Sequence, residues 1–242
     1  MQGQAPLSNS THVPGWESLR EENALIHLAR QVPANGTIVE LGGEYGRSAS
    51  QFAYALKIDN KQGHVYTVDM FPLDHPVVGN LQKAWYANIT EAGFRDYCTP
   101  IRGTTLEGAV IWNEHKTPID LLFIDAGHTY EDVKADIAAW SDFVKVGGVM
   151  AFHDYAQNPD AHPLHWEVKR AVDEWHNEHK TEWMRYSGPD SLVWFVRTTQ
   201  PVTVIGKVIA PREDKPSDFV ATAPPKPKGK GGRPPKAKVE KE

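Results

Sequence analysis

The sequence has little cysteine and no long apolar segment. Cys98 is the single cysteine among 242 residues, so the chain can form no internal disulfide, a usage that suits a reducing cytoplasm. No apolar run approaches the roughly 18 residues that a membrane-spanning helix requires. The first residues also lack the basic and then apolar pattern of a secretory signal peptide. We therefore expect a cytoplasmic protein without membrane contact.

Two common nucleotide-binding patterns are also missing. Gly42 opens a glycine-rich turn, but Glu44 and Arg47 occupy the third and sixth positions from it, where a dinucleotide fingerprint needs glycine. Gly46-Arg47-Ser48 is not the Gly-Lys-Ser/Thr end of a phosphate loop. Glu44 disfavours a polyphosphate as well, because like charges would meet at a poorly solvated site. The turn therefore predicts a cofactor without a phosphate chain.

Charge is unevenly distributed along the chain. The formal net charge is −5, but residues 222–242 carry seven Lys/Arg against two Glu, so the first 221 residues carry −10. A hydrophobic content of 40% over this length can bury one large core. We expect a flexible arm at 1–13, a single domain at 14–210 and a disordered basic tail, rich in Pro, Gly and Lys, at 211–242.

Between these ends, segments of strand character alternate with segments of helical period. That alternation predicts an α/β fold with a parallel sheet, whose ligands bind outside the carboxyl ends of the strands. The expected strands are one that reaches Glu40 and others at 64–69, 98–103, 119–125, 147–154, 183–186 and 191–197. The expected helices are 16–32, 47–56, 76–92, 106–112, 130–144 and 165–179.

The stretch from Gly36 to Ser48 predicts a strand, a tight turn and a helix, at which a nucleotide-like cofactor would lie. Glu40 at the strand end could accept a hydrogen bond from a ribose. Asp69, 27 residues after Gly42, is a candidate for the two ribose hydroxyls, or it could be a loop aspartate that caps a turn. Topology alone suggests that Gly103-Thr104 borders the adenine.

The pattern Glu-Leu-Gly-Gly-x-x-Gly-x-Ser resembles the first motif of class I S-adenosylmethionine (SAM) methyltransferases. SAM has no phosphates and carries a sulfonium, so it tolerates nearby carboxylates. A plain β-turn-α unit of another α/β protein is the alternative. With SAM as cofactor, the expected binding residues are Glu40, Gly42, Gly43, Tyr45, Gly46, Ser48, Asp69, Gly103, Thr104 and Asp125.

Polar side chains end two further strands that we expect to be neighbours. Asp125-Ala-Gly-His128 and His153-Asp154 would converge in one crevice, where hard oxygen ligands favour Mg²⁺, Ca²⁺ or Mn²⁺ over zinc. A metal there would lower the pKa of a substrate hydroxyl, and His128 could take its proton. Alternatively, the aspartates cap the following helices and His153 is a satisfied core residue.

Four motifs together resemble the class I methyltransferase family that includes macrocin-type and other antibiotic-sugar O-methyltransferases. They are the Glu40–Ser48 turn, Phe123-Ile-Asp-Ala-Gly-His-Thr-Tyr130, Gly147-Gly-Val-Met-Ala-Phe-His-Asp154 and Val168-Lys-Arg-Ala-Val-Asp-Glu-Trp175. The resemblance implies a Rossmann-like, doubly wound, mostly parallel sheet of seven strands, SAM as donor, and often Mg²⁺-dependent methylation of a hydroxyl. It makes Asp125 and Asp154 candidate metal ligands, with His153 as the third candidate, and it makes His128 the candidate base, with Asp125 as its partner in catalysis. His153 stands where relatives commonly carry the first of two adjacent acids.

The expected acceptor is a small molecule such as a sugar or a phenol. His162, His165 and Trp166 could contact it, or they could belong to a loop and helix packed on the core. Gly232-Arg233-Pro234 resembles an AT-hook without its first arginine, so weak nucleic-acid contact through the tail is a second hypothesis. No Asp/Asn-Pro-Pro-Tyr/Phe motif for DNA base methylation is present. A non-catalytic SAM-fold module is the third hypothesis.

Overall fold

We describe the protein from a computed structural model, which covers residues 13–158 and 160–198. Within these residues, seven strands form one sheet in the order β3-β2-β1-β4-β5-β7-β6. The strands are β1 (Thr37–Leu41), β2 (His64–Asp69), β3 (Cys98–Arg102), β4 (Ile119–Ile124), β5 (Val144–Phe152), β6 (Trp183–Ser187) and β7 (Val193–Arg197). The strands from β1 to β5 pair in parallel, whereas β7 is antiparallel to both β5 and β6. The mostly parallel seven-stranded sheet expected from the sequence is confirmed.

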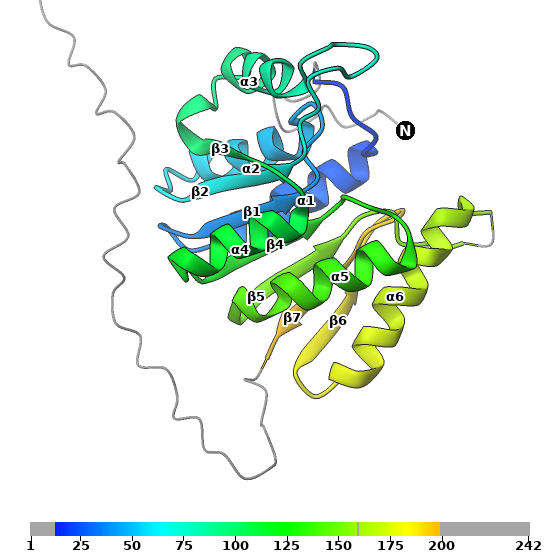
Figure 1. Ribbon diagram of the computed structural model, residues 1–242. Helices are drawn as coiled ribbons and strands as arrows, with labels where there is room; N and C mark the ends of the chain where they lie inside the picture. Colours follow the sequence, from blue (N-terminus) through cyan, green and yellow to red (C-terminus); the bar gives the residue numbers. More distant parts are fainter. Residues whose placement is uncertain (1–12, 159, 199–242) are drawn as a thin grey trace, which may run out of the picture.

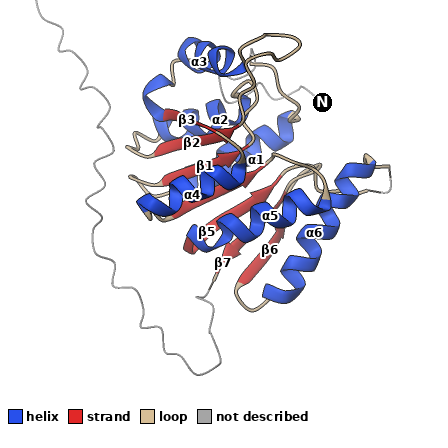
Figure 2. Ribbon diagram, viewed as in Figure 1, coloured by secondary structure: helices blue, strands red, loops and turns tan. Residues whose placement is uncertain are grey.

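The helices cover both faces of this sheet (Figures 1 and 2). They are α1 (Leu19–Gln31), α2 (Arg47–Ile58), α3 (Leu81–Glu91), α4 (Thr105–His115), α5 (Tyr130–Trp140) and α6 (Pro163–His179), with short 3₁₀ turns η2 (Arg95–Tyr97) and η3 (Ser141–Phe143). One apolar cluster joins α1, α2 and α3 to one face, and a second joins α4, α5 and α6 to the other.

The side chains of β4 show why this strand lies at the centre. All its residues are buried, with Leu121 and Phe123 in one apolar cluster and Leu122 and Ile124 in the other. Successive side chains of a strand point to opposite faces, so a continuous apolar run fits a strand covered on both sides. Burying each such side chain stabilises the fold by about 2 kcal/mol. This core fixes the ends of β1 and β5 on either side of β4.

Several element boundaries differ from the sequence prediction, those of α3, α5 and β5 among them. Helix α3 begins at Leu81, not at Pro76, because the side chain of Asn80 caps it by accepting from the backbone N–H of Lys83. The preceding loop is closed by a two-hydrogen-bond bridge between His75 and Gly79. Helix α5 ends at Trp140, and β5 begins at Val144 with an irregularity in its pairing to β4, so the strand prediction at 147–154 started late.

Some predictions concern residues outside the described part of the chain. Residues 1–12 of the expected arm at 1–13 lie there, as does the basic tail at 211–242 with its AT-hook-like segment, so these predictions stay untested. Among the described helices, none combines the length and the apolar character needed to cross a bilayer.

Candidate active site

The turn between β1 and α2 brings two strand ends into close contact. Gly42 has a φ of +83°, and a Cβ atom there would lie 2.0 Å from the carbonyl oxygen of Asp125. A Cβ on Gly43 would lie 2.1 Å from Cγ2 of Thr67. Real Cβ atoms do not approach other heavy atoms so closely, and φ values in this range favour glycine. These two glycines are therefore required by the packing of the turn itself.

Asp69, at the end of β2, holds this turn in shape. Its Oδ2 atom accepts hydrogen bonds from the backbone N–H groups of Gly43 (2.9 Å) and Glu44 (3.1 Å), and its Oδ1 atom accepts from Phe71 (2.7 Å). These contacts are those of an aspartate that caps a turn, which is the alternative role considered for Asp69 from the sequence. The side chain still borders a cavity, so its role towards a ribose stays a prediction.

Glu40 does not fit the ribose contact expected from its position at the strand end. Its side chain is fully buried and accepts hydrogen bonds from the hydroxyls of Ser48 and Thr67 (2.7 Å for Thr67). Burial raises the pKa of Glu40 to about 8, although the two hydrogen bonds act to lower that pKa. Glu40 therefore joins β1, β2 and α2 inside the protein instead of facing a ligand.

A first cavity of about 750 Å³ opens over the carboxyl ends of the parallel strands. This volume is within the range of small-molecule sites. The expected site residues that line it are Gly42, Gly43, Ser48, Asp69, Gly103, Thr104, Asp125, His128, His153 and Asp154. Glu40, Tyr45 and Gly46 lie outside the lining. The Tyr45 carbonyl accepts from the Asn88 amide, and Gly46, at a φ of +89°, precedes α2.

The residues that follow β4 and β5 meet at the edge of this cavity. His128 Nε2 lies 2.9 Å from Asp154 Oδ2 and 3.7 Å from Asp125 Oδ1. His153 Nδ1 lies 3.4 Å from an oxygen of each aspartate. One ligand atom from each of Asp125, His128 and Asp154 can be chosen so that all lie within 4.8 Å of one another, close enough to hold one metal ion. The convergence expected from the strand order is present, with His128 rather than His153 completing the compact group.

The charges of this group are strongly coupled. Interactions with Asp125 and Asp154 raise the pKa of His128 to about 9. Burial acts to lower the pKa of His153, but the charge of Asp125 and hydrogen bonds to the carboxylates hold it well above its ordinary value. Burial alone would raise the pKa of Asp154, yet its contacts with His128 and His153 depress it far below the usual range. Both aspartates are therefore ionised at neutral pH, facing protonated imidazoles.

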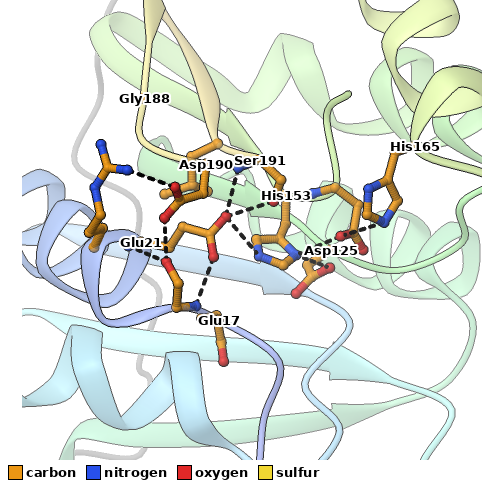
Figure 3. A network of polar contacts seen from close by, with 12 residues as sticks. Glu17, Glu21, Asp125, His153, His165, Gly188, Asp190 and Ser191 are labelled. Atoms are coloured by element: carbon orange, nitrogen blue, oxygen red, sulfur yellow. Dashed lines mark hydrogen bonds and ion pairs between the residues drawn. The ribbon is translucent and has the colours of Figure 1, made fainter. Parts of the chain in front are cut away.

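Glu21, on α1, belongs to this network although the sequence did not single it out. Its Oε1 atom accepts from the backbone N–H (2.8 Å) and the hydroxyl (2.7 Å) of Ser191 and lies 3.6 Å from His153 Nε2. Figure 3 shows Glu21 between Ser191 and His153, with Asp125 on the far side of the imidazole. Locally, Glu21 also forms a capping box with Ser18 at the start of α1, and a Ser-x-x-Glu spacing signals only that contact.

A second cavity, of about 1020 Å³, adjoins the first, and both are lined by Trp16, His128, His153 and Asp154. His165, at the start of α6, also lines it and places Nε2 3.0 Å from Asp154 Oδ1. Of the other two candidate acceptor contacts, His162 lines this cavity while capping α6, and Trp166 does not line it. His128 and Asp154 thus lie where the two cavities meet, and Asp125 lines the first cavity beside them.

Residues 39–155, which run from β1 through the His153-Asp154 pair, match the family model described as a methyltransferase domain. This part of the chain is therefore similar to a methyltransferase domain. It contains the turn, the ends of β2 and β4, and the group formed by Asp125, His128 and Asp154.

Several solved structures have folds similar to that of this chain. A cofactor-bound protein, Rv0187 from MTB, superposes with a TM-score of 0.60 at 20% identity over 78% of this chain and 84% of that one. The O-methyltransferase TomG from Streptomyces achromogenes, solved with SAM, gives 0.59 at 18% identity over 76% and 82%. A Bacillus cereus O-methyltransferase in complex with SAH gives 0.58 at 17% identity over 78% and 86%. The chain shares their Rossmann-like fold.

Proposed function

We propose that this protein transfers the methyl group of SAM to a hydroxyl of a small molecule. One observation carries the proposal: Asp125, His128 and Asp154 meet where the first cavity, under the glycine turn, opens into the second. A donor in one cavity and an acceptor in the other would react at that junction. The similar solved structures include O-methyltransferases in complex with SAM or SAH, which supports methyl transfer from SAM to a hydroxyl.

The first cavity is the proposed donor site. Gly103 and Thr104 border the adenine end beside β3, and Asp69 lies between that end and the glycine turn. Gly42 and Gly43 line this cavity without side chains, so a donor could approach their backbone closely. Asp125 lies at the end of β4, on the other side of β1 from Asp69, so the donor would extend across the strand ends.

His128 is the proposed base for the acceptor hydroxyl. Its Nε2 atom lies at the junction of the cavities, and a proton taken there would be stabilised by Asp154 at 2.9 Å and by Asp125. Because its raised pKa favours the protonated imidazole at neutral pH, only the neutral fraction of His128 can act as the base, and that fraction grows as the pH approaches 9. The methyl transfer itself needs the hydroxyl in line with the sulfonium, so the domain contributes mainly position and charge.

The same three side chains fit a divalent metal ion. The carboxylate oxygens of Asp125 and Asp154 suit Mg²⁺ or Mn²⁺, and His128 has a ligand atom within 4.8 Å of them. While His128 coordinates an ion it would not act as the base, so the two roles are alternatives for its imidazole. A bound divalent ion would lower the pKa of a coordinated hydroxyl. Asp125 and Asp154 would hold it, while His165, 3.0 Å from Asp154, would keep that carboxylate oriented.

Calorimetric titration with SAM, with and without Mg²⁺ and a chelator, tests the donor assignment. We expect micromolar binding by the wild-type chain and weaker binding by Asp69→Ala. Transfer of a labelled methyl group from SAM to a panel of sugars and phenols then tests the acceptor class. A folded chain that binds no SAM would rule out the proposed function. Methylation of DNA or protein, with no labelled small molecule, would rule out the proposed acceptor class.

A further inference from the structure

The segment 13–18, which we call the N-terminal strap, lies against the first cavity. Its residues Pro14, Gly15, Trp16 and Glu17 line that cavity, although the family match begins only at residue 39. Arg47, the first residue of α2, fastens the strap: its Nη1 atom donates to the carbonyl of Val13 at 3.0 Å. Arg47 lines the cavity as well, so strap and glycine turn share one wall of it.

Glu17 brings a buried carboxylate to this wall. Its side chain is only 5% exposed, and its Oε2 atom lies 3.4 Å from Arg47 Nε. Neither of these two atoms has a hydrogen-bond partner within the described structure. A buried carboxylate oxygen and guanidinium N–H without hydrogen bonds are costly, and a ligand that bonds to them would remove the cost.

The charge around Glu17 selects the kind of ligand group. Arg47 also faces Glu22, whose Oε2 atom lies 3.6 Å from its Nη2 atom, so one guanidinium opposes two carboxylates. Burial raises the pKa of Glu17, and the negative charge of Asp125 acts in the same direction. A cationic group at this wall would offset the second carboxylate and stabilise the ionised form of Glu17.

The position of Glu17 in the fold indicates which end of the donor would lie beside it. The strap reaches the cavity on the side of β4 and β5, since the charges of Asp125 and His153 act on Glu17. The proposed adenine end, Gly103 and Thr104, lies beyond β2 at the end of β3. A donor stretched between these sides would present its amino-acid end, with an ammonium and a carboxylate group, to the strap.

We propose that Glu17 binds the α-ammonium group of the methyl donor, while Arg47 positions Glu17 and offers Nε to the α-carboxylate. The assignment rests on the proposed function, since it takes the first cavity as the donor site. A charge-assisted hydrogen bond of this kind contributes on the order of tenfold or more to affinity. The strap would thus select donors and products that keep the amino-acid end.

Two ligands without a sulfonium isolate this contact. S-adenosylhomocysteine keeps the amino-acid end, whereas 5′-methylthioadenosine lacks it. Calorimetric titration of the full chain with each ligand should show that Glu17→Gln weakens S-adenosylhomocysteine about tenfold or more and leaves methylthioadenosine within about twofold. Glu17→Asp, which keeps the charge, should recover part of the loss. Glu114→Gln, at an exposed position on α4, is the matched control and should change neither affinity.

The outcomes separate this assignment from the proposed function. Equal weakening of both ligands by Glu17→Gln would mean that Glu17 only holds the strap, and would overturn the contact. Unchanged affinity for S-adenosylhomocysteine would also overturn it, and if SAM alone weakened, Glu17 would face the sulfonium instead. If the contact is overturned in any of these ways but the wild-type chain still binds SAM, the proposed function is unaffected. Wild-type chain that binds none of the three ligands overturns both.

Discussion

The Nε2 atom of His128 lies 2.9 Å from Oδ2 of Asp154, which joins the loop after β4 to the end of β5. Asp154 has a φ of +55°, in the left-handed region, so the chain turns sharply as it leaves β5. That turn aims the carboxylate back towards the imidazole. The contact places a proton-accepting group and a carboxylate at the junction of the two cavities, where the methyl transfer would occur.

Replacing His128 should affect the reaction far more than donor binding. We expect His128→Gln to lower kcat by about 100-fold or more, because general-base assistance contributes at least that much, while SAM affinity changes little. Steady-state rates with the identified acceptor, together with calorimetric SAM titration, measure the two effects. His27→Gln, at an exposed position on α1, is the control. A kcat within a few-fold of wild type would exclude His128 as the base.

Adding a side chain at Gly42 should block the donor site by displacing the Asp125 backbone. The new Cβ of Gly42→Ala would lie 2.0 Å from that carbonyl oxygen, and Gly42→Val adds further bulk. We expect SAM affinity to fall steeply in both variants, by about 100-fold or more for valine. Gly147→Ala is a matched control: its φ of +81° is similar, but a Cβ there meets nothing within 4 Å. Equal losses in both alanine variants would attribute the effect to backbone strain alone.

Stability should fall as the pH rises from about 4.5 to about 8 because of Glu40. Its folded-state pKa of about 8 is above the ordinary value of 4.5, so in this window the folded state retains a proton that the unfolded state has lost. The stabilising contribution is complete below pH 4.5 and is lost as the pH passes 8. The slope is about 1.4 kcal/mol per pH unit between the two values.

Urea unfolding of wild type and Glu40→Gln across this range measures the effect. Glutamine keeps a similar size and can still accept from Ser48 and Thr67, but it does not titrate. The difference in the free energy of unfolding between the two proteins should therefore change steadily with pH, whatever other groups contribute. A constant difference between pH 5 and pH 8 would contradict the burial of an ionisable Glu40.

Removal of metal should lower the rate of methyl transfer if the group of Asp125, His128 and Asp154 binds Mg²⁺ or Mn²⁺. We expect a chelator to reduce kcat by about tenfold or more and added Mg²⁺ to restore it. Asp154→Asn should weaken metal binding measured by calorimetry, whereas Asp96→Asn, at an exposed position, should not. Full activity in the chelator would show that the group works without a metal ion.

Local sequence signals predicted most of the fold. Runs such as Ile119–Ile124 have the apolar, β-branched character of strands covered on both faces, and that character depends on neighbours in sequence. The start of α3 was predicted too early because Pro76, Val77 and Val78 are compatible with a helix pattern. The cap formed by Asn80 and the bridge from His75 to Gly79 decided that boundary instead.

The sequence by itself determined that Asp125, His128 and Asp154 would lie at one edge of the sheet, since parallel neighbours end on the same side. Only the tertiary structure decided what each acid contacts. Glu40 points into the protein and accepts hydrogen bonds from the hydroxyls of Ser48 and Thr67, because the sheet pairs β1 with β2 and packs α2 over them. Side-chain direction at a strand end follows from that packing.

The same reason applies to the N-terminal residues. Glu21 has a complete local explanation as a helix-capping residue, yet it also lies 3.6 Å from His153, a residue 132 positions further along the chain. Glu17 likewise meets Arg47 only because α1 packs beside α2. Contacts between residues distant in sequence form when helices dock on the sheet, and no local pattern encodes them.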